Sequence, residues 1–311
     1  MYFTPPPVSI PSAYESLQLQ HIKVSHYPVG SAAATPVVIV TLNRPEKRNA
    51  FTMPMSEDLE KVYSLFDRDE RVRVVVLTGA GNTFCAGADL EIGFRALEER
   101  SKNHRDSGGR VALAIHRCRK PTIAAMQGSA VGVGMTMVLP AAIRIAHDTS
   151  KYGFVFARRG ITMESCSSYF LPRLIGHSRA NYLVSTGAVF PSTSPNFGGL
   201  FAETMPQQSQ VLPRALALAT EIAENVSPQA ASLNRELMWR GPESAEEAHL
   251  LESEVIYHRF ISPDQKEGVT AFFEKRKPNF TGNVDRNQPA SYPWWADVNI
   301  DPPSPAEKSK L

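Results

Sequence analysis

Residues 82–90 have the sequence Asn82-Thr83-Phe84-Cys85-Ala86-Gly87-Ala88-Asp89-Leu90 and follow an apolar, β-branched run. Residues 127–135 have the sequence Gln127-Gly128-Ser129-Ala130-Val131-Gly132-Val133-Gly134-Met135 and follow a second such run. Glycine lets the backbone approach a ligand closely, and a turn that opens a helix leaves N–H groups without partners. Either cluster alone is more typical of a tight turn packed with small residues. Neither matches a phosphate loop, which needs a later glycine and a Lys-Ser/Thr pair.

The segments around these clusters predict an α/β fold with short buried strands between helices. Strands are expected at 36–42, 72–78 and 122–126, because these runs are apolar, rich in β-branched residues and end at turn signals. Apolar residues with helical spacing are found in residues 53–66, 111–118, 212–223 and 245–260, and from 267 onward. The second cluster is expected to open an apolar helix. The charged segment 91–119 predicts a surface loop that continues into a helix.

Composition shifts along the chain suggest its organisation. Residues 1–30 are rich in Pro and Ser and predict a flexible N-terminal arm with room for one short strand. The main core is expected over residues 31–205 and a helical C-terminal region over 206–280. Periodicity is lost after Pro278, so residues 281–311 are expected to form a tail.

The overall composition excludes several classes of protein. The chain has 311 residues, of which 42% are hydrophobic and 21% charged, with a formal net charge of +2. This balance favours neither disorder nor nucleic-acid binding. No run approaches the roughly 20 apolar residues of a membrane span. The three cysteines and eight histidines lack metal-ligand spacing, so we expect no metal site and no structural disulfide.

The sequence ends in Ser309-Lys310-Leu311 after a polar, proline-containing segment. This tripeptide is the address recognised by the peroxisomal import receptor. We therefore expect a peroxisomal location, with that receptor as a partner.

Five ordered motifs resemble the crotonase (enoyl-CoA hydratase/isomerase) family. They are residues 43–51, 84–90, 120–125, 128–134 and 267–276, and the resemblance spans about 37–280. It implies a crotonase spiral of ββα units with a helical C-terminal region. It also implies an acyl-CoA thioester substrate, no cofactor beyond the CoA of that substrate, and assembly as a homotrimer or a dimer of trimers. Fatty-acid metabolism, including β-oxidation, is the implied setting.

The resemblance also suggests which residues form the site. The backbone N–H groups of Ala88 and Val133 match the two donors of the family's oxyanion hole, although the family usually has glycine at the position of Val133. The loop residues Ala86, Gly87, Ala88, Asp89 and Leu90 would contact the substrate. Asp89 is expected to hold this loop through backbone hydrogen bonds rather than to act as a base. Lys47 and Arg48 would meet CoA phosphates, and Phe272 and Lys275 would contact the CoA of a neighbouring subunit. For these last four residues, a solvated or packing role fits as well.

The expected acid–base residues favour an isomerase. Family hydratases use two glutamates, but the matching positions here are Thr136 and, approximately, Phe156, so efficient hydration is not expected. Glu164, in the segment 161–172, matches the catalytic glutamate of peroxisomal 3-enoyl-CoA to 2-enoyl-CoA isomerases. A single base suffices for that reaction. A pocket lined by residues such as Phe154, Phe156, Phe170 or Leu171 would raise the pKa of Glu164.

Other interpretations stay open at this point. Glu164 could simply cap a helix near its N-terminus, where acidic side chains are favoured. A hydratase is the main alternative function. A dienoyl-CoA isomerase would share the scaffold, but it would need acids where Thr136 and Phe156 stand. A non-catalytic CoA-ester-binding subunit is a further alternative, because Met163 and Ser165 replace the Pro and Gly usual in the isomerases.

Overall fold

The computed structural model describes residues 9–91, 103–283, 285–286 and 288–301. The chain forms two compact units. The first comprises Met1–Gly93 and Asp106–Thr220, and the second Phe94–Arg105 and Glu221–Leu311. Within the described residues, none of the helices is both long enough and apolar enough to cross a bilayer.

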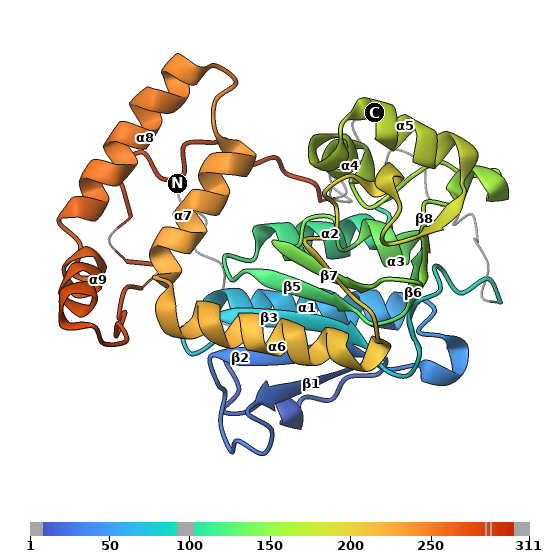
Figure 1. The fold of residues 1–311 in the computed structure, drawn as a ribbon, viewed down its shortest axis with the longest axis horizontal. Coiled ribbons are helices and arrows are strands. Elements are labelled where there is room, and N and C mark those ends of the chain that lie inside the picture. Colours follow the sequence, from blue (N-terminus) through green and yellow to red (C-terminus); the bar gives the residue numbers. More distant parts are fainter. Residues whose placement is uncertain (1–8, 92–102, 284, 287, 302–311) are drawn as a thin grey trace, which may run out of the picture. The chain divides into compact units, whose positions relative to one another are not determined.

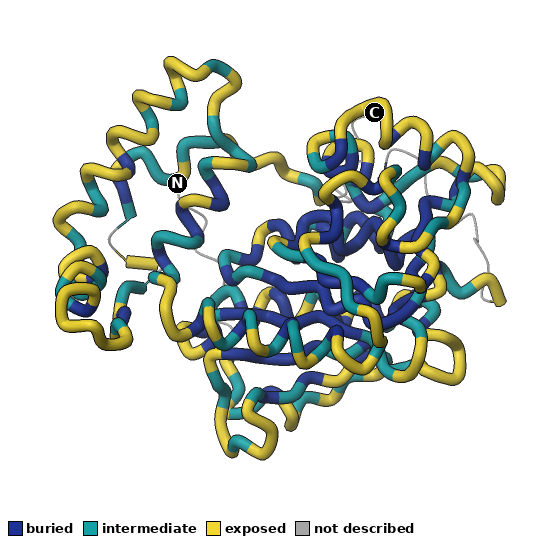
Figure 2. The backbone as a smooth tube through the Cα atoms, viewed as in Figure 1, coloured by how far each residue is buried: buried dark blue, intermediate teal, exposed yellow. Residues whose placement is uncertain are grey.

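A six-stranded sheet forms the centre of the first unit (Figure 1). In sheet order its strands are β1 (Ile22–Tyr27), β2 (Val37–Leu42), β3 (Val74–Gly79), β5 (Thr122–Met126), β7 (Ile143–His147) and β10 (Glu203–Met205). The β1–β2 pair is antiparallel and the other pairs are parallel. The inner strands are buried over most of their length (Figure 2), as continuous Val- and Ile-rich parallel strands require.

A second sheet carries the two glycine clusters. Its strands, in order, are β4 (Thr83–Cys85), β6 (Ser129–Val131), β8 (Lys151–Gly153) and β9 (Val189–Pro191). Strands β4 and β6 are parallel, with Thr83 opposite Ser129 and Cys85 opposite Ala130. Because parallel neighbours end at the same edge, the loops that follow them emerge side by side.

Helices complete the first unit. They are α1 (Met53–Arg68), α2 (Ser107–Arg117), α3 (Val133–Thr136), α4 (Ser167–Ile175), α5 (His177–Thr186) and α6 (Gln208–Asn225), which continues into the second unit, with short 3-10 turns η1 (Tyr14–Ser16), η2 (Pro45–Lys47), η4 (Phe156–Arg159) and η5 (Pro195–Phe197). Helix α1 packs against α2. Side-chain oxygens cap both helices, because Thr52 accepts a hydrogen bond from the N–H of Met55 and Asp106 from that of Gly109.

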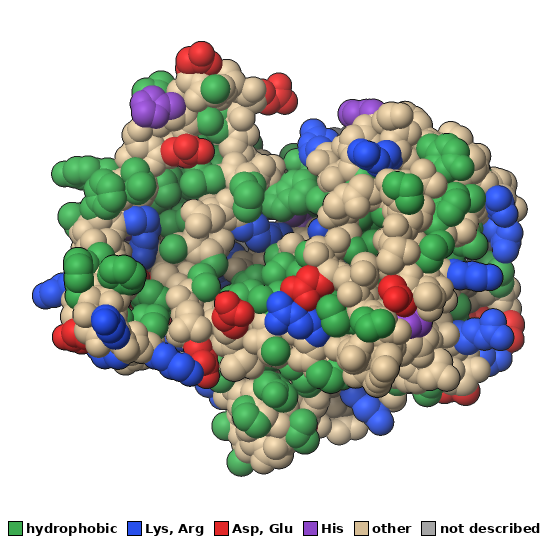
Figure 3. All heavy atoms as spheres, in the orientation of Figure 1, with side chains coloured by type: hydrophobic (Ala, Val, Ile, Leu, Met, Phe, Trp, Pro, Cys, Tyr) green, Lys and Arg blue, Asp and Glu red, His purple; other side chains and the backbone are tan. Residues whose placement is uncertain are grey.

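The second unit contains α7 (Pro228–Arg240), α8 (Ala245–Phe260) and α9 (Pro263–Glu274), capped by Ser227, Ser244 and Ser262. The described residues after α9 contain no helix or strand, yet they pack on it. The buried Asp264 accepts hydrogen bonds from Ser227 and from the N–H of Gly282. Large apolar side chains are exposed on α8 and α9, where green side chains gather in Figure 3. They include Leu250, Ile256, Tyr257, Phe260, Val269, Phe272 and Phe273.

Several boundaries differ from the sequence expectation. The expected arm contains β1, an edge strand of the large sheet. Strand β3 begins at Val74 rather than at Val72, because the N–H of Val72 closes a turn on Asp69. Helix α9 begins four residues earlier than predicted, at Pro263, directly after its cap Ser262. The helix expected after the second glycine cluster, α3, is only four residues long, and Pro140 soon follows and disfavours its extension.

The close approach of the loops predicts that alanine substitutions at two glycines will differ in their effect on stability. An alanine Cβ at Gly128 would lie 2.0 Å from the carbonyl oxygen of Asn82, whereas one at the exposed Gly199 would meet nothing within 4 Å. The Gly128→Ala variant should therefore unfold with a free energy lower by about 1–3 kcal/mol or more, because backbone must move to make room. Gly199→Ala should change it by less than about 0.5 kcal/mol. Urea denaturation measures both, and equal stability of the two variants would contradict the packing described.

Candidate active site

Glycines bring the two cluster loops into contact. A Cβ at Gly87 would lie 3.2 Å from the carbonyl oxygen of Val131, and one at Gly134 would lie 2.5 Å from that of Cys85. Gly87 and Gly132 both have positive φ, 92° and 55°, a conformation that side chains disfavour. The backbone of one loop therefore lies directly against that of the other.

The Ala88 N–H has no hydrogen-bond partner among the described residues, and the cause is local. Phe51 pairs with Ala88 in a parallel bridge. In that bridge Phe51 donates to the carbonyl of Gly87 and accepts from the N–H of Asp89, at 2.8 and 3.0 Å. Phe51 thus bonds the two residues that flank Ala88 and leaves the N–H of Ala88 pointing elsewhere.

The Val133 N–H is likewise unpaired within the described part of the chain. Val133 is the first residue of α3, so it has no partner inside the helix. The neighbouring donors are occupied, because the N–H of Gly132 bonds the carbonyl of Gly153 and that of Thr136 bonds the carbonyl of Gly132. With α3 so short, any attraction for an anion comes mainly from the N–H group itself rather than from a helix dipole.

Glu164 lies beside α3. Its Oε1 accepts a hydrogen bond of 2.6 Å from Oγ1 of Thr136, the last residue of the helix that Val133 opens. Its Oε2 accepts one from Oγ of Ser165. The structure therefore brings the expected base and one expected oxyanion donor together through a single helical turn. Thr136, at the position of a family glutamate, is a hydrogen-bond donor to Glu164.

The environment of Glu164 favours the protonated carboxyl more than water does. Burial raises the pKa of its carboxyl group, the hydrogen bonds from Ser165 and Thr136 lower it, and the nearby Asp106 carboxyl raises it. Burial dominates, so the pKa lies above that of an ordinary glutamate. A neighbouring thiol, Cys85, is buried, and its burial raises its pKa to about 12, so it stays neutral.

The turn that carries Glu164 is strained and is held by a residue that the sequence analysis did not select. Ser165 and Cys166 both have a φ of 55°, which is costly for residues with a side chain. The N–H of Ser165 donates to Oδ2 of Asp106, the cap of α2, over 3.1 Å. An Asp before Ser107-Gly108-Gly109 is a sequence signal for a helix cap, but it does not reveal the bond to Ser165.

The residues expected to line an acyl pocket are in different surroundings. Phe156 is 7% exposed, and its ring lies 3.9 Å from the position that a Cβ on Gly132 would take, so it is next to the second loop. Phe170 is buried and packs edge-to-face on His116. Phe154 and Leu171 are fully buried. Of the four, Phe156 has the position best suited to contact a substrate at the loop.

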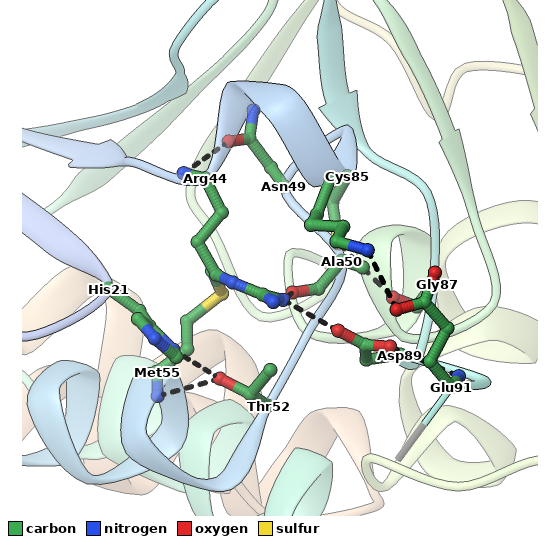
Figure 4. A network of polar contacts seen from close by, with 11 residues as sticks. His21, Arg44, Asn49, Ala50, Thr52, Met55, Cys85, Gly87, Asp89 and Glu91 are labelled. Carbon is green, nitrogen blue, oxygen red and sulfur yellow. Dashed lines mark hydrogen bonds and ion pairs between the residues drawn. The ribbon is translucent and has the colours of Figure 1, made fainter. Parts of the chain in front are cut away.

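Asp89 stabilises the first loop (Figure 4). Its carboxylate forms a 2.9 Å ion pair with Arg44 and accepts the N–H of Glu91. Arg44 in turn donates to the carbonyl of Ala50. A carboxylate held by these bonds and only 7% exposed is better suited to fixing the loop than to removing a proton. The adjacent Leu90 is 59% exposed and Ala86 is also exposed.

The remaining expected residues lie outside this cluster. Lys47 forms an exposed 2.7 Å ion pair with Glu91, and the carbonyl of Arg48 accepts the N–H of Ala86. Phe272 and Lys275 belong to the second unit, on α9 and at its C-terminal end, and Phe272 is 78% exposed. Their roles in CoA binding stay predictions. The tripeptide 309–311 lies outside the described residues, which contain no group of three or more potential metal ligands.

Comparisons with known proteins agree with this architecture. The family model described as enoyl-CoA hydratase/isomerase matches residues 32–283. The enoyl-CoA hydratase AFT3-1 of Alternaria alternata is 50% identical over 247 residues, which cover 79% of this chain and 83% of that protein. The mevalonyl-coenzyme A hydratase sidH of Aspergillus fumigatus is 33% identical over 248 residues, covering 78% and 91%.

Solved structures show the same fold. The crystal structure of an enoyl-CoA hydratase from Bacillus anthracis superposes with a TM-score of 0.74 at 29% identity, covering 85% of this chain and all of that one. The α/β crotonase fold expected from the sequence is thereby confirmed. On the family match and these similarities, the chain belongs to the enoyl-CoA hydratase/isomerase family.

Proposed function

We propose that this enzyme moves the double bond of a 3-enoyl-CoA to the 2 position, with Glu164 as the base. The observation that carries the proposal is the carboxyl group of Glu164, which accepts a hydrogen bond from Thr136 of α3, the helix whose first N–H has no partner among the described residues. Glu164 would take a proton from C2 of the substrate and return it at C4. The thioester oxygen becomes negative in the dienolate between these steps, and the N–H groups of Ala88 and Val133 would stabilise it.

Hydration of a 2-enoyl-CoA is the second candidate function. Relatives that are 49–50% identical to this chain carry the name enoyl-CoA hydratase, which favours it. Hydration also passes charge to the thioester oxygen, so the same two N–H donors would serve. Against it stand Thr136 and Phe156, which cannot activate water as carboxylates do.

Peroxisomal location and homo-oligomer formation are further parts of the proposal. The location rests on Ser309-Lys310-Leu311. Assembly as a trimer or a dimer of trimers rests on the family resemblance and is supported by the exposed apolar side chains of α8 and α9. A role in a pathway of fatty acids or fatty-acid-derived metabolites, such as β-oxidation, belongs to the same proposal.

Substitution of Glu164 tests whether the enzyme works by the proposed isomerisation or by hydration. Glu164→Gln should lower kcat/KM for a medium-chain 3-enoyl-CoA by roughly 10²–10⁴-fold, because the amide cannot accept the C2 proton. The exposed Glu57 on α1 provides a matched control, and Glu57→Gln should retain wild-type turnover. Both variants would be assayed with a 3-enoyl-CoA and a 2-enoyl-CoA. Hydration as the main wild-type activity, or isomerisation that survives Glu164→Gln, would refute the proposed reaction.

The raised pKa of Glu164 predicts an acid limit to activity. The base must be deprotonated, so kcat/KM should fall as the pH drops through a value above the usual glutamate range. The hydrogen bond from Thr136 lowers this pKa, so Thr136→Val should move the limit to higher pH. Rate profiles between pH 4 and pH 9 measure the change. A limit that stays in place, or moves to lower pH, would contradict the role of the Thr136 bond.

A further inference from the structure

Asp106 is a carboxyl group at the site that the proposed reaction does not use. It is the N-cap of α2, and its Oδ2 accepts the N–H of Gly109 over 2.5 Å. The same oxygen accepts the N–H of Ser165, 59 residues further along the chain. One carboxylate therefore joins the start of α2 to the turn that carries Glu164.

The backbone conformation of this turn must be held by contacts with neighbouring groups. Ser165 and Cys166 both occupy the left-handed region, each with a φ of 55°. Such residues persist only where surrounding contacts hold them. Three hydrogen bonds within the described structure help to hold this turn. Asp106 accepts the N–H of Ser165, and the carbonyl of Glu164 accepts both the N–H and the Oγ–H of Ser167.

Glu164 also lies directly against the first turn of α2. A Cβ at Gly108 would come within 1.9 Å of Oε2 of Glu164 and 2.3 Å of Oγ of Ser165. The missing side chain at Gly108 thus makes room for the glutamate carboxyl. Since Asp106 caps this same turn, its carboxyl and that of Glu164 are neighbours, and the Asp106 charge raises the pKa of Glu164.

We propose that Asp106 is a positioning residue for Glu164. It fixes the strained Glu164–Ser165 turn on the N-terminus of α2 and keeps a second negative charge next to the base. The inference rests on the proposed role of Glu164 as that base. A residue that only capped α2 would affect stability without affecting the ionisation of Glu164.

The other groups around Glu164 determine which ionisations can change the pH dependence of kcat/KM. Thr136 on α3 and Ser165 donate hydrogen bonds to it. Two thiols, Cys85 on β4 and Cys166, also interact with its charge, and burial raises the pKa of each. Arg117 on α2 lowers the pKa of Cys166. Both thiols stay neutral where Glu164 titrates, so Asp106 is the neighbouring carboxylate whose removal should change the acid limit.

Two substitutions test the two parts of the proposal. Asp106→Asn keeps an oxygen acceptor for the N–H groups of Gly109 and Ser165 but removes the charge. It should keep kcat within a few-fold and move the acid limit of kcat/KM to lower pH by roughly half a unit to one unit. Asp106→Ala removes the acceptor as well, and kcat should fall by roughly tenfold or more, with a smaller change in KM, because the base is displaced.

Ser244→Ala is the matched control, since it removes the cap of α8 in the second unit. It should reduce stability like any lost helix cap while kcat and the pH profile stay those of the wild type. An unmoved acid limit in Asp106→Asn, or a wild-type kcat in a folded Asp106→Ala, would overturn the role of Asp106. Either result would leave the role of Glu164 intact if Glu164→Gln still lowers kcat/KM by roughly 10²–10⁴-fold. Wild-type turnover by Glu164→Gln would instead refute the proposed function itself.

Discussion

The pairing of β4 with β6 is the constraint on which the rest of the site depends. The two strands run parallel, so the loops after them leave the sheet together. Their backbones lie so close that Gly128 and Gly134 have no space for a Cβ. This closeness places Ala88 on one loop and Val133 on the other in adjoining segments. Neither N–H has a hydrogen-bond partner among the described residues. Both donors can therefore bind a ligand.

Glu164 lies outside the two loops, but it and its turn are hydrogen-bonded to the helices that follow them. Thr136 binds its carboxyl from the helix that follows the second loop, and Asp106 holds its turn from the helix that follows the first. In the proposed reaction, the same short helix would provide an N–H donor to the thioester oxygen at its start and orient the base Glu164 at its end. Displacement of α3 would therefore move the Val133 N–H and the Glu164 carboxyl together.

Much of the first unit could be predicted from local sequence signals. Strand β5 was predicted with its observed bounds and α1 nearly so, and in the second unit α8 was predicted with its observed bounds, because apolar periodicity and caps mark these elements clearly. The start of β3 was predicted two residues too early, since a turn at Asp69 competes with the apolar pattern. Glu164 and the two loops were selected through family motifs. Asp106 was missed because its bond to Ser165 depends on tertiary structure, which no local pattern encodes.

The burial of Cys85 has a consequence for the chemistry that this edge of the sheet tolerates. Burial raises the pKa of its thiol to about 12, so the thiolate, which is the form that reacts with peroxides and alkylating reagents, is scarce at neutral pH. A cysteine can therefore lie against the backbone of Gly134 without being a reactive nucleophile. A low thiolate fraction disfavours oxidation and alkylation of this thiol.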